Sequence, residues 1–232
     1  MSMQISERTK NLLGNFAQIN NSIYIKPGSK ISTIAVTKNV FATAEVNEQF
    51  PEAFAIYDLG QFLNGWNLFA DSSQVDFQFN NESFLTIKSG RSKLKYFYCD
   101  PDVLILPPDK ELGLPETQFS FQLNEDVLVS LLKASRVLYL PDLCLECKGG
   151  DVTLAVKDKD NETSNTVSYV VGKSDVPFCF NFKMETIKII PGDYNVDVCT
   201  RAAKFNRITD PKDLLKRLEY FIALEPDSTY GN

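Results

Sequence analysis

The chain repeats one short plan of secondary structure, and this repetition limits its fold more than any other feature. An amphipathic helix predicted over 6–19 is followed by short strands, and a helix over 124–138 is again followed by strands. Each helix places apolar side chains three and four residues apart, which forms one face that must be buried. The sequence therefore predicts an α+β fold of two similar domains, with helices packed on antiparallel sheets.

A proline-rich stretch near the midpoint divides the two halves. Residues 103–117 lose all periodicity, which is typical of a linker. Before this stretch, Asp58 is a good N-cap for a second helix, and after it a short helix is expected about Met184. We therefore expect an N-terminal domain at 1–102, a connector, and a C-terminal domain at 118–232, each with two helices.

Most of the remaining segments have the pattern of strands. Alternating or continuous apolar runs bounded by turn residues lie at 22–46, 54–57, 75–79, 84–89, 93–98, 119–123, 143–171, 178–182 and 189–198. In the later stretch 206–219, Asp210 and Pro211 resemble an N-cap and a first-turn residue. We interpret this stretch as a loop insertion that holds an added helical turn.

The composition favours a soluble globular protein. The 44% of hydrophobic residues, among them 17 Phe, can fill one large core or two smaller ones. No apolar run approaches the roughly 20 residues that span a bilayer, and the N-terminus lacks the pattern of a signal peptide. We expect no membrane association and a location in the cytosol.

The sequence lacks the residues that several classes of catalytic and metal site require. The chain has no histidine, so triads and most general-base schemes at neutral pH are excluded. The carboxylates are scattered, and the glycines form no phosphate-binding loop. Cys144 and Cys147 have the spacing of metal ligands, but no second pair completes a site, so a strand is the simpler interpretation. We expect no catalytic residues, no metal and no cofactor.

Positive charge gathers on helix faces although the chain is acidic overall. The net charge is −6, yet Lys10 in the first helix, and Lys133 and Arg136 in the later one, lie opposite the apolar sectors, with Arg8 on a flank. These residues could simply be solvated, and the charges of the later helix also suit the helix dipole. Alternatively, such faces could surround a polyanion without binding it tightly.

Literal strings in a fixed order resemble the DNA polymerase sliding clamps of T4-type bacteriophages. The strings are LGNFAQIN at 13–20, IYDL at 56–59, PGDY at 191–194, AAKF at 202–205 and ALEPDS at 223–228. Together they extend over nearly the whole chain. The resemblance implies the DNA clamp fold and a non-enzymatic processivity factor that encircles duplex DNA.

The family plan implies a closed ring of three subunits joined head to tail, a homotrimer. Such a heterologous ring needs two complementary edges on each subunit. The matching edges are the strand-like segments 93–98, with Leu94, Tyr96 and Tyr98, and 166–171, with Val167, Tyr169 and Val171. The pore-lining cations would then be Arg8, Lys10, Lys133, Arg136 and Lys188.

The resemblance also implies protein partners. These are the replicative DNA polymerase, an ATP-dependent clamp loader and late-transcription proteins, in the cytoplasm of a host bacterial cell. A partner peptide is expected in a hydrophobic pocket formed by Leu112, Leu114, Leu224, Pro226 and Val40. The same residues could instead pin the linker and tail to the sheet.

Two other classes of function make different demands on the sequence. A scaffold protein could use the same strand edges to assemble without DNA, and would tolerate charge reversal at Lys133 and Arg136. An enzyme, such as a metal-dependent nuclease, would need a localised acid or nucleophile site, for which the sequence offers no candidate.

Overall fold

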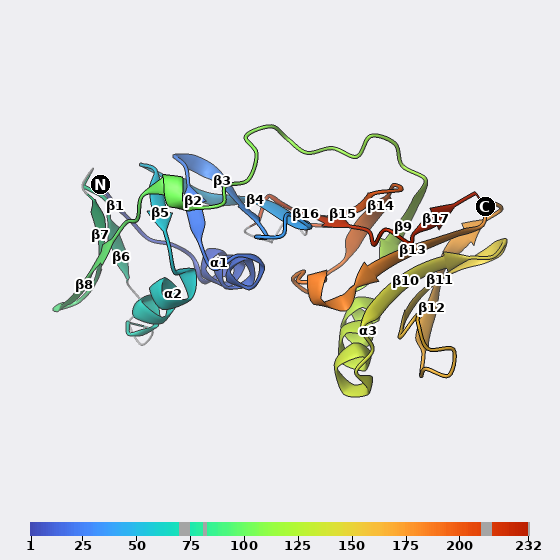
Figure 1. The fold of residues 1–232 in the computed structure, drawn as a ribbon. Helices are drawn as coiled ribbons and strands as arrows, with labels where there is room; N and C mark the ends of the chain where they lie inside the picture. The colour runs from blue at the N-terminus through green and yellow to red at the C-terminus, as the bar shows by residue number, and fades with distance from the viewer. Residues whose placement is uncertain (70–74, 81–82, 210–214, 232) are drawn as a thin grey trace. The chain divides into compact units, whose positions relative to one another are not determined.

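The computed structural model describes residues 1–69, 75–80, 83–209 and 215–231. The chain divides into two compact units (Figure 1). Unit 1 is Met1–Asp109 with Thr209–Leu218, and unit 2 is Lys110–Ile208 with Glu219–Asn232.

Among the described residues, unit 1 holds two α-helices and a set of antiparallel strands. Its elements are β1 (Ser2–Met3), α1 (Glu7–Ile19), β2 (Ile23–Ile25), β3 (Gly28–Ile34), β4 (Val40–Phe50), β5 (Phe54–Ile56), α2 (Leu59–Asn67), β6 (Asp76–Gln78), β7 (Phe84–Ser89), β8 (Ser92–Phe97) and the 3-10 turn η1 (Pro101–Val103). One antiparallel sheet has the order β1-β6-β7-β8, which leaves β8 at an edge. In addition, β2 pairs with β5 and β3 with β4.

The two helices of unit 1 contact each other and bury their apolar residues. In α1 the residues Leu12, Leu13 and Phe16 are at most 1% exposed, and the helix contacts α2, β3 and β4. In α2 the Trp66 ring meets Phe77 edge-on at 4.6 Å between ring centroids. Figure 1 shows both helices on one side of the strands, so their polar faces point away from the sheet.

Unit 2 repeats the strand pattern with one α-helix. Its elements are β9 (Phe119–Leu123), α3 (Glu125–Leu138), β10 (Asp142–Cys147), β11 (Gly150–Lys157), β12 (Val167–Ser174), β13 (Phe178–Lys183), the 3-10 turn η2 (Met184–Thr186), β14 (Tyr194–Val198), β15 (Ala202–Arg207), β16 (Arg217–Ala223) and β17 (Thr229–Tyr230). One sheet runs β12-β11-β10-β13-β17, with β12 at its edge, and a second runs β16-β15-β14-β9.

The core of unit 2 lies where these two sheets face each other. Leu145, Phe180 and Tyr194 are fully buried. Phe205 of β15 packs edge-on against Phe182 of β13, at 6.5 Å between ring centroids, and thus links the sheets. The helix α3 contacts β11 and β12.

The expected helix 124–138 is confirmed as α3, but its cap differs from the simplest one. Asn124 occupies the N-cap position without a side-chain cap bond, and Asp193 Oδ1 instead accepts the Glu125 N–H at 2.7 Å. At the other end Tyr139 adopts the left-handed conformation with φ 55°. Ser135 Oγ donates to the Leu140 carbonyl at 2.7 Å and fixes that exit.

The expectation of two α-helices per domain needs correction in the second half. The short helix expected about Met184 is the single 3-10 turn η2, because the chain leaves it directly at Ile187, whose backbone is not helical. Ile187 and Ile189 are buried at 6% and 4% exposure, so core packing holds this segment without a longer helix. The helical turn expected at Asp210 and Pro211 lies outside the described residues.

A half-buried carboxylate, that of Glu48, fixes the start of α1. Ser6 Oγ accepts the Thr9 N–H at 3.2 Å, and Glu48 of β4 accepts the Ser6 N–H at 2.7 Å and the Thr9 hydroxyl at 2.8 Å. Burial acts to raise the pKa of Glu48, but the hydrogen bonds from Ser6 and Thr9 outweigh it and leave the pKa lowered. Glu48 therefore ties the first helix to its sheet in the ionised form.

The Glu48→Gln variant should lower the free energy of unfolding by about 1–2 kcal/mol at neutral pH, because an amide accepts these bonds more weakly. Because the pKa of Glu48 is lower in the folded state, its ionised form stabilises the fold. This contribution is fully present above the pKa of an unfolded Glu, about 4.3, and is lost as the pH falls through the lower pKa of the folded state. Urea unfolding at pH 7 and at about pH 3 measures both. Glu116→Gln, at an exposed position, is the control, and an equal effect of the two variants would contradict the assignment.

Candidate functional site

The exposed face of α3 carries the predicted cations of unit 2. Leu128 and Leu131 are each 2% exposed and turn toward the sheet. Lys133 and Arg136 are exposed, one helical turn apart, on the opposite side. Both side chains are therefore open to a ligand. Apolar residues are exposed as well: Val129 and Val137 lie one turn from Lys133, and Leu138 and Tyr139 lie at the end of the helix.

The cations of α1 lie in a different environment. The side chain of Lys10 is only 13% exposed, with Nζ 3.4 Å from Glu7 Oε1 and 5.0 Å from the centroid of the Trp66 ring. Arg8 is half-buried. The helix pattern alone placed Lys10 opposite the apolar sector, as an outward-facing cation. In the structure α2 packs beside this position, so the Lys10 ammonium lies near Trp66 instead. Lys10 is therefore engaged within unit 1.

Neutral amides dominate the open helical surface of unit 1. The exposed polar positions of α1 and α2 that carry amides are Asn11, Gln18, Gln61, Asn64 and Asn67. The sequence did not assign them to the DNA-facing surface, because that prediction rested on charge. In unit 2, Lys188 follows η2, is half-buried, and donates its backbone N–H to the Thr186 carbonyl at 2.9 Å.

The predicted interface residues of β8 face their own unit. The Tyr96 hydroxyl donates to the Asp58 carbonyl at 3.1 Å, and its ring meets Phe62 edge-on at 5.1 Å. Tyr98 stacks on Phe54 at 5.6 Å, and burial next to Glu52 raises its pKa. Leu94 is half-buried, on the same side of the strand. The side chain that projects away is Phe97, which is 62% exposed.

The edge strand β12 repeats this arrangement. Tyr169 and Ser130 of α3 share a hydrogen bond of 2.7 Å between their hydroxyl oxygens. Val167 and Val171 are half-buried on the same side, whereas Val170 is 63% exposed on the other. Both predicted segments therefore form edge strands in which a tyrosine is anchored to a helix on the inner side. On the outer side Phe97 stands beside Lys93 and Lys95, and Val170 stands beside Ser168.

The residues of the predicted partner pocket lie in both units. Leu112 is 38% exposed and Leu114 is half-buried, both in the linker. After β16, Leu224 is half-buried and Pro226 is exposed. Val40 of β4 is 3% exposed, so it belongs to the core of unit 1. This pocket stays a prediction.

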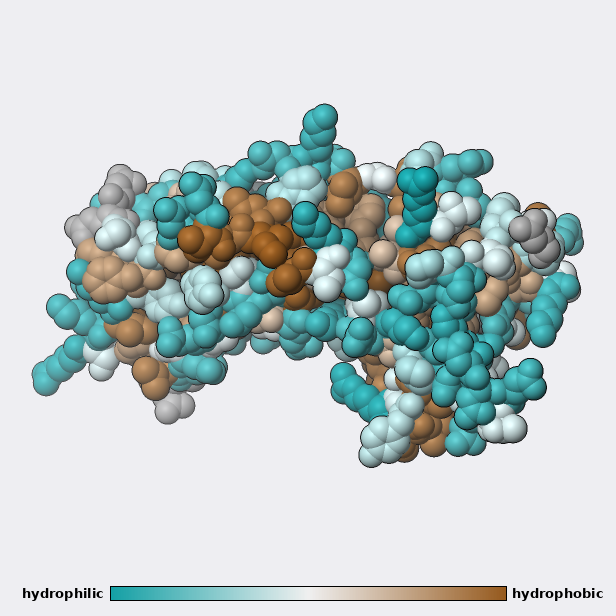
Figure 2. Space-filling view, in the orientation of Figure 1, coloured by the Kyte–Doolittle hydropathy of each residue, from teal (hydrophilic) through white to brown (hydrophobic). Residues whose placement is uncertain are grey.

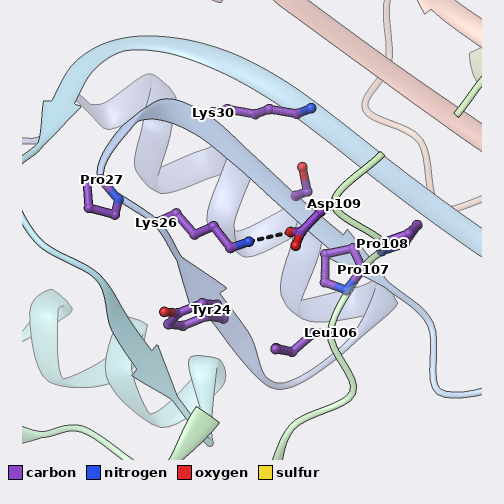
Figure 3. A pocket seen from close by; sticks show the side chains of 9 residues that line it. Tyr24, Lys26, Pro27, Lys30, Leu106, Pro107, Pro108 and Asp109 are labelled. Atoms are coloured by element: carbon purple, nitrogen blue, oxygen red, sulfur yellow. Dashed lines mark hydrogen bonds and ion pairs between the residues drawn. The ribbon is translucent and has the colours of Figure 1, made fainter. Parts of the chain in front are cut away.

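A different hollow was not anticipated from the sequence. It lies in unit 1 and has a volume of about 570 Å³. Its lining comes from β2, β3 and the start of the linker, through Tyr24, Lys26, Pro27, Lys30, Ser32 and Leu106–Asp109 (Figure 3). No periodicity in these three segments could reveal it, because the linker reaches β2 and β3 only in the folded chain.

The spacing of Cys144 and Cys147 does not make a metal site. Both residues lie in β10, and an odd separation along a strand directs them to opposite faces. Burial raises the pKa of the Cys144 thiol to about 12, so it stays protonated at neutral pH.

No helix within the described ranges is both long and apolar enough to cross a membrane.

The fold defines a class of protein. The structure of PCNA from Thermococcus kodakaraensis matches with a TM-score of 0.70 at 13% identity, over 97% of this chain and 99% of that one. PCNA from A. fulgidus, bound to the C-terminal region of FEN-1, matches with a TM-score of 0.73 at 10% identity, over 98% and 99%. The chain therefore has the DNA clamp fold, which confirms the predicted fold class.

Sequence comparisons narrow the class to a family. Residues 6–106 match the family described as DNA polymerase processivity factor, and residues 120–226 match the gp45 sliding clamp C-terminal domain. The sliding clamp of Vibrio phage KVP40 is 34% identical over 96% of this chain and 99% of its own length, and that of Enterobacteria phage T4 is 29% identical over 98% and 99%. The chain belongs to the family of phage sliding clamps, the DNA polymerase processivity factors, as its sequence predicted.

Removal of one hydroxyl tests how the β12 edge is held. Tyr169→Phe should lower the free energy of unfolding by about 1 kcal/mol, because Ser130 then loses its partner in a half-buried position. Urea unfolding monitored by circular dichroism measures the change. Tyr139→Phe, at a position 90% exposed, should leave stability unaltered. If Tyr169→Phe is as stable as the wild type, the bond does not anchor the edge.

Proposed function

We propose that three copies of this chain join head to tail into a ring that closes around duplex DNA and tethers the replicative polymerase to its template. The observation that carries the proposal is the pair of edge strands, β8 in unit 1 and β12 in unit 2. Each presents backbone N–H and C=O groups on its free side, a liability unless another strand covers it. Membership in the sliding-clamp family supports the ring.

The edges suit an assembly between two different surfaces. On β8 the outward apolar side chain is Phe97, and on β12 it is Val170. Pairing of such strands would complete the backbone hydrogen bonds and bury these side chains together. Because the two edges differ, repeated pairing is heterologous and produces a ring when the rotation closes.

Charge would keep the ring mobile on DNA. In an acidic chain of net charge −6, Lys133 and Arg136 on α3 form a local positive face. Screening over about 10 Å at 0.1 M salt lets this face attract nearby phosphates, while the repulsion from more distant acidic groups is damped. Contacts to phosphates carry no base sequence, so the bound ring could slide.

The proposed partners follow the family. They are duplex DNA, the replicative polymerase and an ATP-dependent clamp loader, with docking of late-transcription proteins as a further role, all in the cytoplasm of a host bacterium. The clamp itself would act without catalysis, by topology and tethering. A scaffold that assembles without DNA would not need the open cations of α3, and family membership does not favour it.

The first test is solution mass. Analytical ultracentrifugation without DNA should give a species near three times the 26.2 kDa monomer, or a monomer–trimer equilibrium. Val170→Glu should weaken the trimer at least about tenfold, because a carboxylate would be placed at the apolar edge. Val176→Glu, at a position 37% exposed outside the strands, is the control. A strict monomer at tens of micromolar would remove the ring mechanism.

The charged face is tested separately through salt dependence. Lys133→Gln together with Arg136→Gln should weaken association with nicked circular DNA and flatten the plot of log affinity against log salt, by about 0.9 for each phosphate that is no longer neutralised. Lys10→Gln should have a smaller effect, because its ammonium already contacts Glu7 and Trp66. If Lys10→Gln matches or exceeds the double variant, the assignment of the DNA-facing surface to α3 is wrong.

A further inference from the structure

The hollow of unit 1 joins apolar walls to two ammonium groups. In Figure 3 Lys30 lies toward one end, Tyr24 and Leu106 lie toward the other, and the ion pair between Lys26 and Asp109 lies between them. The hollow is formed by unit 1 alone and measures about 570 Å³. None of the residues predicted for the partner pocket lines it.

The apolar part of the site extends beyond the hollow. Val103, Ile105 and Leu106, where the linker begins, are 63%, 38% and 40% exposed. Figure 2 shows hydrophobic side chains gathered on unit 1, in the region where Figure 1 draws η1 and the start of the linker. An exposed apolar patch beside a hollow is typical of a surface that binds a partner.

The charges indicate the chemistry of that partner. Lys26 is paired with Asp109, whereas the side chain of Lys30 makes no hydrogen bond or ion pair with any residue that the structure describes. The hollow therefore has one more positive than negative side chain, in a chain whose net charge is −6. An incoming carboxylate would find one free ammonium group and a second held only by an exposed side chain.

The Lys26–Asp109 pair is suited to exchange. The side chains of Lys26 and Asp109 are 54% and 83% exposed, and ion pairs in water contribute little to stability. The hydrogen bond from Lys26 lowers the pKa of Asp109, so Asp109 is ionised at neutral pH and occupies the place that a partner carboxylate would take. Asp109, in the linker, would therefore compete with a partner carboxylate for Lys26.

We propose that this hollow is a second docking site, which binds a short acidic segment of a partner protein in extended conformation. One carboxylate of the segment pairs with Lys30 and another displaces Asp109 from Lys26, while an aliphatic side chain packs on Tyr24, Leu106 and Pro107. A phosphate-bearing ligand would satisfy the lysines but leave the apolar wall unused. The site goes beyond the ring and its predicted pocket, because it is complete within one unit.

The test uses a defined probe on the full-length protein. A capped, fluorescein-labelled ten-residue peptide of alternating leucine and aspartate is compared with its leucine–asparagine counterpart by fluorescence anisotropy. We expect the acidic peptide to bind at least about tenfold more tightly, as charge-assisted hydrogen bonds require. Equal affinity of the two peptides, or no binding of the acidic one at 1 mM, would overturn the proposal.

Variants show where the peptide binds and whether each charged residue strengthens or weakens that binding. Lys26→Gln together with Lys30→Gln should lower the affinity for the acidic peptide at least about tenfold. Asp109→Asn should strengthen it about twofold to fivefold, because the competitor of an exposed pair is removed. The matched control, Lys88→Gln with Arg91→Gln, removes the same charge from exposed positions that do not line the hollow.

The contradicting results are distinct. A control that weakens binding as much as the lysine variant would mean that only net charge matters. Loss of binding in Leu112→Ala with Leu114→Ala, but not in the lysine variant, would place the peptide in the predicted partner pocket instead. Weaker binding by Asp109→Asn would show that Asp109 supports the site rather than competes for it. Displacement by inorganic phosphate but not by unlabelled acidic peptide would assign the lysines to phosphate ligands.

Discussion

Packing of amphipathic helices on antiparallel sheets is the constraint on which the rest of the structure depends. The apolar residues of α1, α2 and α3 become buried where the helices pack on strands and, in unit 1, on each other, so the opposite faces of the helices point to solvent. The sheets also end in β8 and β12, because each unit supplies a limited number of strands. Open helix faces and open strand edges are thus two consequences of one packing arrangement, and the proposed ring uses both.

The two units present different chemistry on their helices. α3 exposes Lys133 and Arg136, whereas α1 and α2 expose mainly neutral amides and hold Lys10 against Trp66. An acidic chain with cations confined to part of its helical surface attracts phosphates at short range only, since screening limits the interaction to about a Debye length. A clamp that slides needs this kind of weak attraction, because a strongly basic surface would slow its movement on DNA.

The linker has a role beyond connecting the two halves. Its first residues, Leu106–Asp109, help to line a hollow with β2 and β3, and Asp109 pairs with Lys26. This exposed contact adds little stability, and it places a carboxylate where an acidic partner would bind. The hollow and the predicted pocket farther along the linker would give the clamp two separate places at which partners could meet it.

The sequence by itself determined the family, the helices 6–19 and 124–138 and most strands, because these depend on local periodicity and on strings that survive in order along the chain. Tertiary structure alone decided which cations are open: Lys10 and Lys133 look alike on a helical wheel, but α2 packs beside only the first. It also decided that Met184 begins a 3-10 turn, and that Lys26, Lys30 and Asp109 share one hollow. The physical reason is that exposure and pairing depend on neighbours distant in sequence, which no local pattern records.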